Sequence, residues 1–318
     1  MIDIIIPCHN SHKTLDRCIG SILMQTEKDN IKVSLVNDGG EDYSELIERY
    51  SPILNIQEIG YEDNGGPGKA RNYGIRKTKE EYIMFIDSDD ALANPFVVHN
   101  LKTILDKKKD VMFVISDIME EVEKDTLKIH KKNENFTHGK MYKRSYLKKN
   151  KISFDTESYC CEDMSFNILC FMLLNKQTEN FFYFPTTTYF WLYNENSIGR
   201  TDRLRYENCV CFRGFVDNLI YLYKELDKHP YPEFKVIAEK TRSMIKCCLY
   251  CSIYTLNYPD GRKENEETLK LFYDEIYSKI EDKVSDKLFY EMYKLLPFDG
   301  EDETNLKNIK HVISLLRK

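Results

Sequence analysis

The sequence of 318 residues contains no apolar run close to the roughly 18 uninterrupted residues that a membrane-spanning helix needs. Its amino terminus also lacks a basic segment followed by a cleavable apolar core, because residues 2–6 already form a strand-like apolar run. From these two absences we expect a cytoplasmic protein, either free or in peripheral contact with the inner face of a membrane.

Only one pair of the ten cysteines, Cys248 and Cys251, has the CxxC spacing that zinc and redox sites use, and no second such pair accompanies it. Four of them form adjacent pairs, at 160–161 and 247–248, and Cys18 and Cys170 fall on apolar faces. We therefore interpret the cysteines as small buried hydrophobic residues of a reducing compartment.

Two phosphate-binding motifs are missing as well. In the glycine-rich segment 63–74, Asp63 stands where GxxxxGKS/T needs its first glycine, and Ala70 stands where it needs the hydroxyl. No GxGxxG follows the first predicted strand. The net charge of −6 and the pI near 5.8 argue against a nucleic acid as the main partner.

Apolar runs that alternate with amphipathic helical patterns are present through the first part of the chain. The predicted strands are 2–6, 31–36, 53–59, 82–86, 111–116, 181–185 and 188–193. Helices are predicted from Thr14, which we expect to cap the first one, around 46–50, after the loop 63–74, over 95–105, near 142–147 and over 164–174. The alternation predicts an α/β fold, a Rossmann-like, mostly parallel sheet with flanking helices.

The last third of the chain has a different character. Its patterns are helical and rich in Tyr, Lys and Glu, over 209–226, 234–256, 264–280 and 305–316. We expect two domains, an α/β domain over residues 1–200 and a helical carboxyl-terminal region over 201–318.

The segment 82–90 ends an apolar run in three acids, Asp87, Asp89 and Asp90. If the backbone stays extended, Asp87 and Asp89 point the same way, at the sheet edge where α/β proteins bind ligands. No Lys or Arg in the run offsets their charge, so Mg²⁺ or Mn²⁺ would relieve the repulsion. Alternatively the acids form a turn or a helix cap. Asp90, expected to face away from the pair, keeps that capping role in either case.

Six elements in a fixed order resemble glycosyltransferase family 2, whose members are inverting enzymes of GT-A fold. They are Pro7-Cys8-His9-Asn10, Asn37-Asp38-Gly39, Asn64-Gly65 with Ala70-Arg71-Asn72, Ile86-Asp87-Ser88-Asp89-Asp90, Glu162-Asp163, and the run from Tyr193 to Ser197. The resemblance covers about the first 200 residues, so it implies that residues 1–200 form a nucleotide-sugar-binding catalytic domain.

The resemblance implies a site for a nucleotide sugar. Asp38 matches the acid that accepts the N3–H of the base, which favours UDP-sugars, with dTDP next and GDP open, and disfavours cytosine. Arg71 matches a nucleotide contact, Asp87 the acid near the ribose, and Asp89, together with Asp87, the ligands of Mn²⁺ or Mg²⁺. Further nucleotide contacts are implied for Pro7, His9, Asn10, Asn64, Gly65 and Ser88.

The implied reaction is an inverting, metal-dependent transfer of a hexosyl or N-acetylhexosaminyl group to an acceptor hydroxyl. Asp163 matches the general base that removes the proton of that hydroxyl, and Glu162 is its rival. Bacterial surface glycan synthesis is the expected setting. A glycan, a lipid-linked and a protein acceptor all stay open.

The sequence departs from the family at two positions. His12 stands where relatives carry a glutamate, and Asn194 stands where they carry an arginine. Neutralisation of the phosphates would then depend on Arg200, Arg203 or Arg205. Two alternative functions remain: a binding module of the same fold whose catalysis has lapsed, and a nucleotidyltransferase.

Overall fold

The structure is a computed structural model that describes residues 1–158, 161–195, 210–229, 232–257, 262–296 and 302–317. The chain divides into two compact units. The first comprises Met1–Thr156 and Phe166–Asn194, and the second comprises Glu157–Ser165 and Glu195–Lys318. The predicted domain boundary between residues 200 and 201 lies outside the described residues and stays a prediction.

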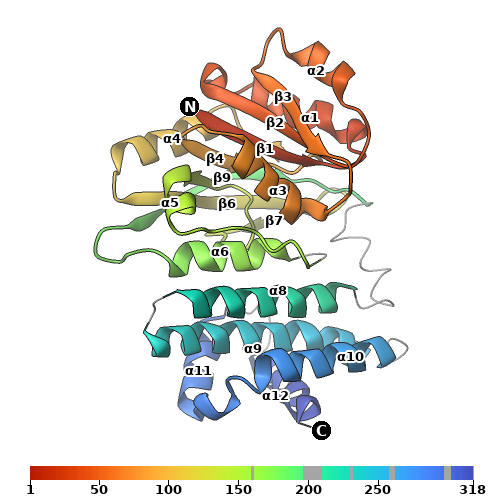
Figure 1. Cartoon of the computed structure of the whole chain (residues 1–318), viewed down its shortest axis with the longest axis vertical. Helices are drawn as coiled ribbons and strands as arrows, with labels where there is room; N and C mark the ends of the chain where they lie inside the picture. The colour runs from red at the N-terminus through yellow and green to blue at the C-terminus, as the bar shows by residue number, and fades with distance from the viewer. Residues whose placement is uncertain (159–160, 196–209, 230–231, 258–261, 297–301, 318) are drawn as a thin grey trace. The chain divides into compact units, whose positions relative to one another are not determined.

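A nine-stranded sheet forms the centre of the first unit (Figure 1). Its order is β3-β2-β1-β4-β8-β6-β9-β5, and β7 pairs with β6 off this path. The strands are β1 (Ile2–Cys8), β2 (Ile31–Asp38), β3 (Ile56–Tyr61), β4 (Tyr82–Phe85), β5 (Ala91–Leu92), β6 (Val111–Glu123), β7 (Thr126–His130), β8 (Met141–Lys143) and β9 (Asn180–Trp191). The long ladders β1–β2, β2–β3 and β6–β9 are parallel, whereas the short strands β5, β7 and β8 join antiparallel. The predicted α/β class with a mostly parallel sheet is confirmed.

The helices of this unit follow the strands in the predicted alternation. They are α1 (His12–Leu23), a 3-10 turn η1 (Lys28–Asn30), α2 (Ser44–Tyr50), α3 (Gly66–Lys77), α4 (Val97–Lys107), α5 (Arg144–Lys149) and α6 (Glu162–Met172), the last of which contributes its first turn to the second unit. Helix α1 begins at His12 with Ser11 as its N-cap residue, so the prediction that Thr14 caps it is wrong. The Thr14 hydroxyl instead donates to the Ser11 carbonyl oxygen at 3.1 Å.

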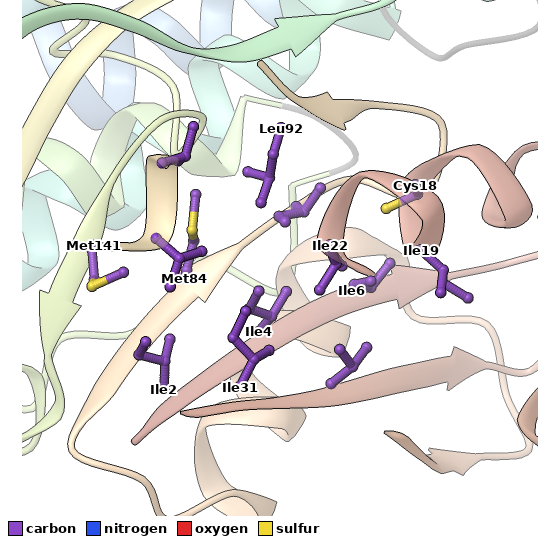
Figure 2. Close-up of a cluster of buried hydrophobic side chains, with 14 of the residues drawn as sticks. Ile2, Ile4, Ile6, Cys18, Ile19, Ile22, Ile31, Met84, Leu92 and Met141 are labelled. Carbon is purple, nitrogen blue, oxygen red and sulfur yellow. The ribbon is translucent and has the colours of Figure 1, made fainter. Parts of the chain in front are cut away.

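The core lies between the parallel strands and α1. Figure 2 shows Ile2, Ile4 and Ile6 of β1 in one buried cluster with residues of α1, including Cys18. All four side chains are 0% exposed, which agrees with the interpretation of Cys18 as a buried hydrophobic residue. Burial of this apolar face holds α1 against the sheet, and so fixes where the loop after β1 begins.

Two predicted strands, 181–185 and 188–193, are one strand in the structure. In the ladder between β6 and β9, Ser116 pairs with Phe184 and Asp117 with Thr187, so two residues of β9 are skipped. One of these is Pro185, which has no N–H to donate to a ladder, and the strand continues beyond the irregularity. The short strands β5 and β8 and the exposed β7 were not predicted.

The second unit is helical in its described carboxyl-terminal part. It contains α8 (Val210–Lys228), α9 (Glu233–Asn257), α10 (Arg262–Phe272), a π-helical turn η4 (Tyr273–Tyr277), a 3-10 turn η5 (Glu281–Lys283), α11 (Asp286–Lys294) and α12 (Asp302–Leu316). The four predicted helices are found, and α11, which Ser285 caps through the Leu288 N–H, was missed. Among the described residues, no helix is both long and apolar enough to cross a membrane.

Candidate active site

The loops after the first three parallel strands meet at the carboxyl edge of the sheet, and His9 ties them together. Its Nδ1 lies 2.9 Å from the Asp38 carbonyl oxygen, while Nε2 lies 3.3 Å from Asn10 Nδ2 and 3.1 Å from Asn64 Nδ2. A carbonyl oxygen can only accept, so Nδ1 carries the proton and Nε2 accepts from both amides. The network brings together four residues that the sequence assigned to the nucleotide.

Asp38 is the last residue of β2, and its side chain is buried. Its Oδ1 accepts a hydrogen bond from the Gly65 N–H at 2.7 Å, just where α3 begins. Gly39 follows with a φ of +66°, and a Cβ there would lie 2.4 Å from the Glu62 carbonyl oxygen, so only glycine fits. In the neighbouring β3, burial and then the Asp38 carboxylate raise the pKa of Tyr61, which keeps this phenol neutral.

The acidic stretch is not an extended strand, so that prediction is wrong. Strand β4 ends at Phe85, and the Asp90 N–H donates to the Asp87 carbonyl oxygen at 3.1 Å, which closes a turn. Alternation along a strand therefore cannot orient the acids. The turn interpretation describes this backbone.

Asp87 has cationic or hydrogen-bonding partners on both carboxylate oxygens. Arg71 of α3 donates to Oδ1 at 2.7 Å, and His138 Nε2 lies 3.1 Å from Oδ2. Burial alone would raise the pKa of Asp87, but the Arg71 charge and the His138 hydrogen bond outweigh it and hold the pKa well below its usual value. No Lys or Arg of the run 82–90 offsets the charge, and the fold supplies Arg71 from α3 instead.

Asp89 has different surroundings. Its Oδ2 accepts a hydrogen bond from the Asn194 side-chain amide at 2.8 Å. Burial, followed by the nearby negative charge of Asp87, raises the pKa of Asp89. Asp89 is thus an acid whose charged form would gain from a cation beside it.

Asp90 does not face away from the acidic pair, and it caps no helix. Its carboxylate accepts hydrogen bonds from the Tyr189 hydroxyl at 2.6 Å and from the Leu192 N–H at 2.9 Å. One of its oxygens belongs to a cluster with ligand atoms of Asp87 and His138, all within 4.8 Å of one another. Burial raises the pKa of Asp90 to about 8.

The donor chemistry of these residues favours one position for a cation. Asp87 and Asp90 each accept hydrogen bonds on both carboxylate oxygens, and a metal ion bound to His138 Nε2 would break the hydrogen bond from His138 to Asp87. Asp89 has one oxygen held by Asn194 and a raised pKa. An oxygen-preferring divalent cation therefore fits Asp89 better than the Asp87–Asp90–His138 cluster.

Ser88 connects the acidic turn to the loop after β1. Its hydroxyl donates to Ser11 Oγ at 2.9 Å, and the Ser11 N–H donates to the Tyr43 hydroxyl at 3.1 Å. Pro7 lies within β1 opposite Val36 and has no side-chain contact that links it to these loops among the interactions described.

The two departures from the family have definite places. His12 Nε2 lies 2.8 Å from the Asp42 carbonyl oxygen, and its ring centroid lies 4.8 Å from that of Tyr43. His12 therefore packs against the loop after β2. Asn194 is the hydrogen-bond donor to Asp89. The three arginines proposed to neutralise phosphates, Arg200, Arg203 and Arg205, lie outside the described residues.

Asp163 and Glu162 lie in the first turn of α6, within the second unit. Glu162 is buried and Asp163 is half-buried. Ser165 anchors this turn to α8, because its N–H donates to Asn218 Oδ1 at 3.3 Å and its Oγ accepts from Asn218 Nδ2 at 2.9 Å. The start of α6 is thereby fixed within its own unit.

Three aromatic residues near these acids escaped the sequence analysis: Tyr61, His138 and Tyr189. The only local signal for His138 is the glycine that follows it, since Gly139 has a φ of +67°. Tyr189 accepts from the Asp87 N–H at 3.1 Å and donates to Asp90, so it holds the acidic turn from a strand 99 residues further along.

Comparison with known proteins gives a coherent result. A family model described as glycosyl transferase family 2 matches residues 3–178. A poly(ribitol-phosphate) beta-glucosyltransferase of Bacillus spizizenii is 26% identical over 74% of this chain and 39% of its own length. The poly(ribitol-phosphate) beta-N-acetylglucosaminyltransferase TarS of Staphylococcus aureus is 28% identical over 54% of this chain and 33% of TarS. The chain thus spans well under half the length of either relative.

Solved structures agree at the level of the fold. The crystal structure of S. aureus TarS in complex with UDP-GlcNAc has a TM-score of 0.69 and 17% identity, over 99% of this chain and 91% of that one. A mannosyltransferase from Pyrobaculum calidifontis, in complex with GDP-Man and Mn²⁺, has a TM-score of 0.55 and 14% identity, over 98% and 85%. The predicted GT-A architecture is confirmed by the likeness to TarS.

Proposed function

The chain belongs to glycosyl transferase family 2, and from that membership we propose that it transfers a sugar from a UDP-sugar to an acceptor hydroxyl group. Two relatives are named for glucosyl and N-acetylglucosaminyl transfer to poly(ribitol phosphate). A hexose or N-acetylhexosamine is therefore the proposed sugar. A polymer of the bacterial cell surface is the proposed acceptor.

One observation carries the proposal: the residues assigned to the nucleotide are joined by hydrogen bonds at one sheet edge. His9 joins Asn10, Asp38 and Asn64, and Arg71 reaches Asp87 from α3. These contacts form two groups, one around His9 and one between Arg71 and Asp87, and both lie at the edge where α/β sheets bind ligands.

In the proposed reaction, Asp38 accepts the N3–H of uracil while the Gly65 N–H fixes its other oxygen. Asp87, held by Arg71, receives the ribose hydroxyls. Asp163 removes the proton of the acceptor hydroxyl while the hydroxyl oxygen attacks C1 of the sugar from the face opposite the diphosphate. The diphosphate leaves, and the configuration at C1 inverts.

Asp89 is the residue proposed to hold Mn²⁺ or Mg²⁺, with Asn194 fixing its carboxylate. When bound there, the cation would offset the charge that develops on the departing diphosphate. Asp87, which the resemblance also implies as a ligand of the cation, is proposed instead to contact the ribose, with Arg71 and His138 holding its carboxylate.

The test is a titration of the purified chain with UDP, CDP and GDP in the presence of Mn²⁺, followed by a hydrolysis screen of UDP-sugars. We expect UDP to bind most tightly and one UDP-sugar to be hydrolysed slowly, with hydrolysis lost in Asp89→Ala. Asp29→Asn, a substitution of an acid that is 93% exposed, serves as control. Absence of UDP binding with Mn²⁺ present would overturn the proposal.

Two alternatives give different results in the same experiment. A lapsed binding module would bind UDP without hydrolysing any UDP-sugar. A nucleotidyltransferase would release pyrophosphate from a nucleoside triphosphate, and the family match lends that alternative no support.

A further inference from the structure

We propose that His138 is a positioning residue of the donor site, which holds the second carboxylate oxygen of Asp87 so that this acid can receive the ribose. The inference rests on the proposed function, because it assigns Asp87 to the nucleotide. It concerns a residue that lies in a polar segment far from every motif of the sequence.

The contact itself is well defined. His138 Nε2 lies 3.1 Å from Asp87 Oδ2, and the His138 side chain is 6% exposed. Asp87 is ionised, because its pKa is held low, so its oxygen can only accept and Nε2 must carry the hydrogen. Arg71 donates to the other oxygen. The carboxylate is therefore held from two sides and has one orientation.

The His138 ring is held in place by aromatic neighbours. It stacks on Tyr189 with ring centroids 4.6 Å apart and an interplanar angle of 3°, and on Phe136 at 5.8 Å and 20°. Trp191 contacts it edge-on at 5.5 Å. Tyr189 also accepts from the Asp87 N–H, so one tyrosine supports both partners of the hydrogen bond.

The backbone around His138 is fixed as firmly as the ring. Asn133 Nδ2 donates to the carbonyl oxygens of Phe136 and His138, at 3.1 and 3.0 Å. The buried Lys140 donates to the same Phe136 oxygen at 2.6 Å and to Asn167 Oδ1 at 2.8 Å. Such a turn presents a pre-oriented side chain, which is what a positioning residue requires.

A metal-ligand role for His138 fits less well. The only cluster that includes it among the described residues also requires Asp87 and Asp90. A metal ion bound to His138 Nε2 would break its hydrogen bond to Asp87 Oδ2, one of the described hydrogen bonds of these acids. The positioning role keeps every one of these bonds.

Two substitutions separate the hydrogen bond from the packing. His138→Phe keeps an aromatic ring between Tyr189 and Phe136 but removes the donor. His138→Gln keeps an N–H donor at similar reach but removes the ring. In Mn²⁺-containing buffer we expect the Kd for UDP to rise about tenfold in His138→Phe, because this variant loses a hydrogen bond to a charged group. In His138→Gln the donor remains, so the Kd for UDP should stay within about twofold of the wild-type value.

His130→Gln is the matched control. His130 also pairs with a carboxylate, with Nε2 2.7 Å from Glu120 Oε2, and its ring lies 6.2 Å from that of Phe136. It has no described contact with Asp87. His130→Gln should bind UDP like the wild type. In His138→Phe, we expect the KM for the donor to change and kcat to stay the same.

Unchanged UDP affinity in His138→Phe would overturn the inference, and so would a greater loss of UDP affinity in His138→Gln than in His138→Phe. Weaker Mn²⁺ binding by His138→Phe, measured by electron paramagnetic resonance, would also overturn it, because it would indicate that His138 is a metal ligand. A double-mutant cycle in urea with His138→Phe and Asp87→Asn tests the contact without nucleotide. If the two substitutions are coupled in their effect on the free energy of unfolding, but the wild type binds no UDP, the contact is real and the proposed function is wrong.

Discussion

Asn194 donates its side-chain amide to Asp89 Oδ2 at 2.8 Å, and this hydrogen bond joins the segment that follows β9 to the acidic turn after β4. The two residues are 105 positions apart. The resemblance to the family leads one to expect an arginine at position 194, whose charge would serve the phosphates. An amide there instead orients the carboxylate proposed to hold the cation.

The first prediction follows from this contact. Asn194→Ala removes the donor, so Asp89 can rotate away from the orientation that a cation needs. We expect the Kd for Mn²⁺ to rise about tenfold, as is typical when the partner of a metal ligand is lost. Electron paramagnetic resonance of free Mn²⁺ measures this directly. Asn30→Ala, which removes an amide donor to Glu27 at 2.7 Å on the surface, is the control, and equal Mn²⁺ affinity in both variants would contradict the prediction.

The second prediction concerns the choice of base. In Asp38→Asn the remaining oxygen can still accept from the Gly65 N–H, while the new amide faces the base as a donor. Uracil offers an N–H at N3 and cytosine offers an acceptor, so the substitution should weaken UDP binding at least about tenfold and strengthen CDP relative to UDP. Calorimetric titration with both nucleotides measures the ratio. A UDP-to-CDP ratio equal to that of Asp29→Asn would show that Asp38 does not read the base.

The sequence predicts well what depends on local periodicity. The apolar run Ile2–Cys8 and the amphipathic pattern of α1 each bury a continuous face, so β1 and α1 could be predicted from spacing alone. The backbone of 86–90 could not. The same residues suit a strand end or a turn, and the bond from the Asp90 N–H to the Asp87 carbonyl oxygen decides between them.

The partners of the acids could not be predicted either, because they come from distant segments. His138 lies 51 residues from Asp87, and Tyr189 lies 99 residues from Asp90. No local pattern encodes such contacts. Asp87 and Asp89 were named from the acidic run itself, and the other residues of the site from the ordered motifs of the family. The roles of all of them remain predictions.

The third prediction tests the turn that carries His138. Gly139 has a φ of +67°, and a Cβ there would lie 2.6 Å from Ser116 Oγ and 2.9 Å from Thr188 Oγ1. Gly139→Ala should therefore lower the free energy of unfolding by about 2 kcal/mol or more, from backbone strain plus the clash. Gly66 has a φ of +82° with nothing within 4 Å of its Cβ position, so Gly66→Ala shows the strain alone. Urea unfolding of both variants measures the difference, and an equal loss would rule out the clash.

The fourth prediction concerns acid stability away from the site. Asp106 of α4 accepts from the Tyr82 hydroxyl at 2.6 Å and from Lys102 Nζ at 2.5 Å. Burial opposes the charge, but these partners outweigh it and lower the pKa of Asp106 below 3.8. The folded state therefore binds fewer protons than the unfolded state in this range. The contribution of Asp106 to the free energy of unfolding is therefore present above about pH 4 and is lost as the pH falls further.

Asp106→Asn removes this titration. In urea unfolding we expect the wild type to exceed the variant in stability at pH 6 and to lose that advantage progressively as the pH falls below about 4. Asp29→Asn, on an exposed acid, should show no such convergence. An advantage of the wild type over Asp106→Asn that grows as the pH falls would contradict the assigned direction of the pKa shift.

The last prediction decides which acid of α6 acts as the base. A general base works only while the proton moves, so Asp163→Asn should lower kcat for sugar transfer by about a hundredfold or more and leave the Kd for UDP unchanged. Glu162→Gln should retain most of the activity, because Glu162 is buried whereas Asp163 is half-buried and can meet a hydroxyl group. Transfer assays with the donor identified by the hydrolysis screen give kcat, and calorimetry gives the Kd. If Glu162→Gln loses transfer activity while Asp163→Asn keeps it, Glu162 is the base. An equal loss of UDP affinity in both variants would mean that the start of α6 binds the nucleotide instead.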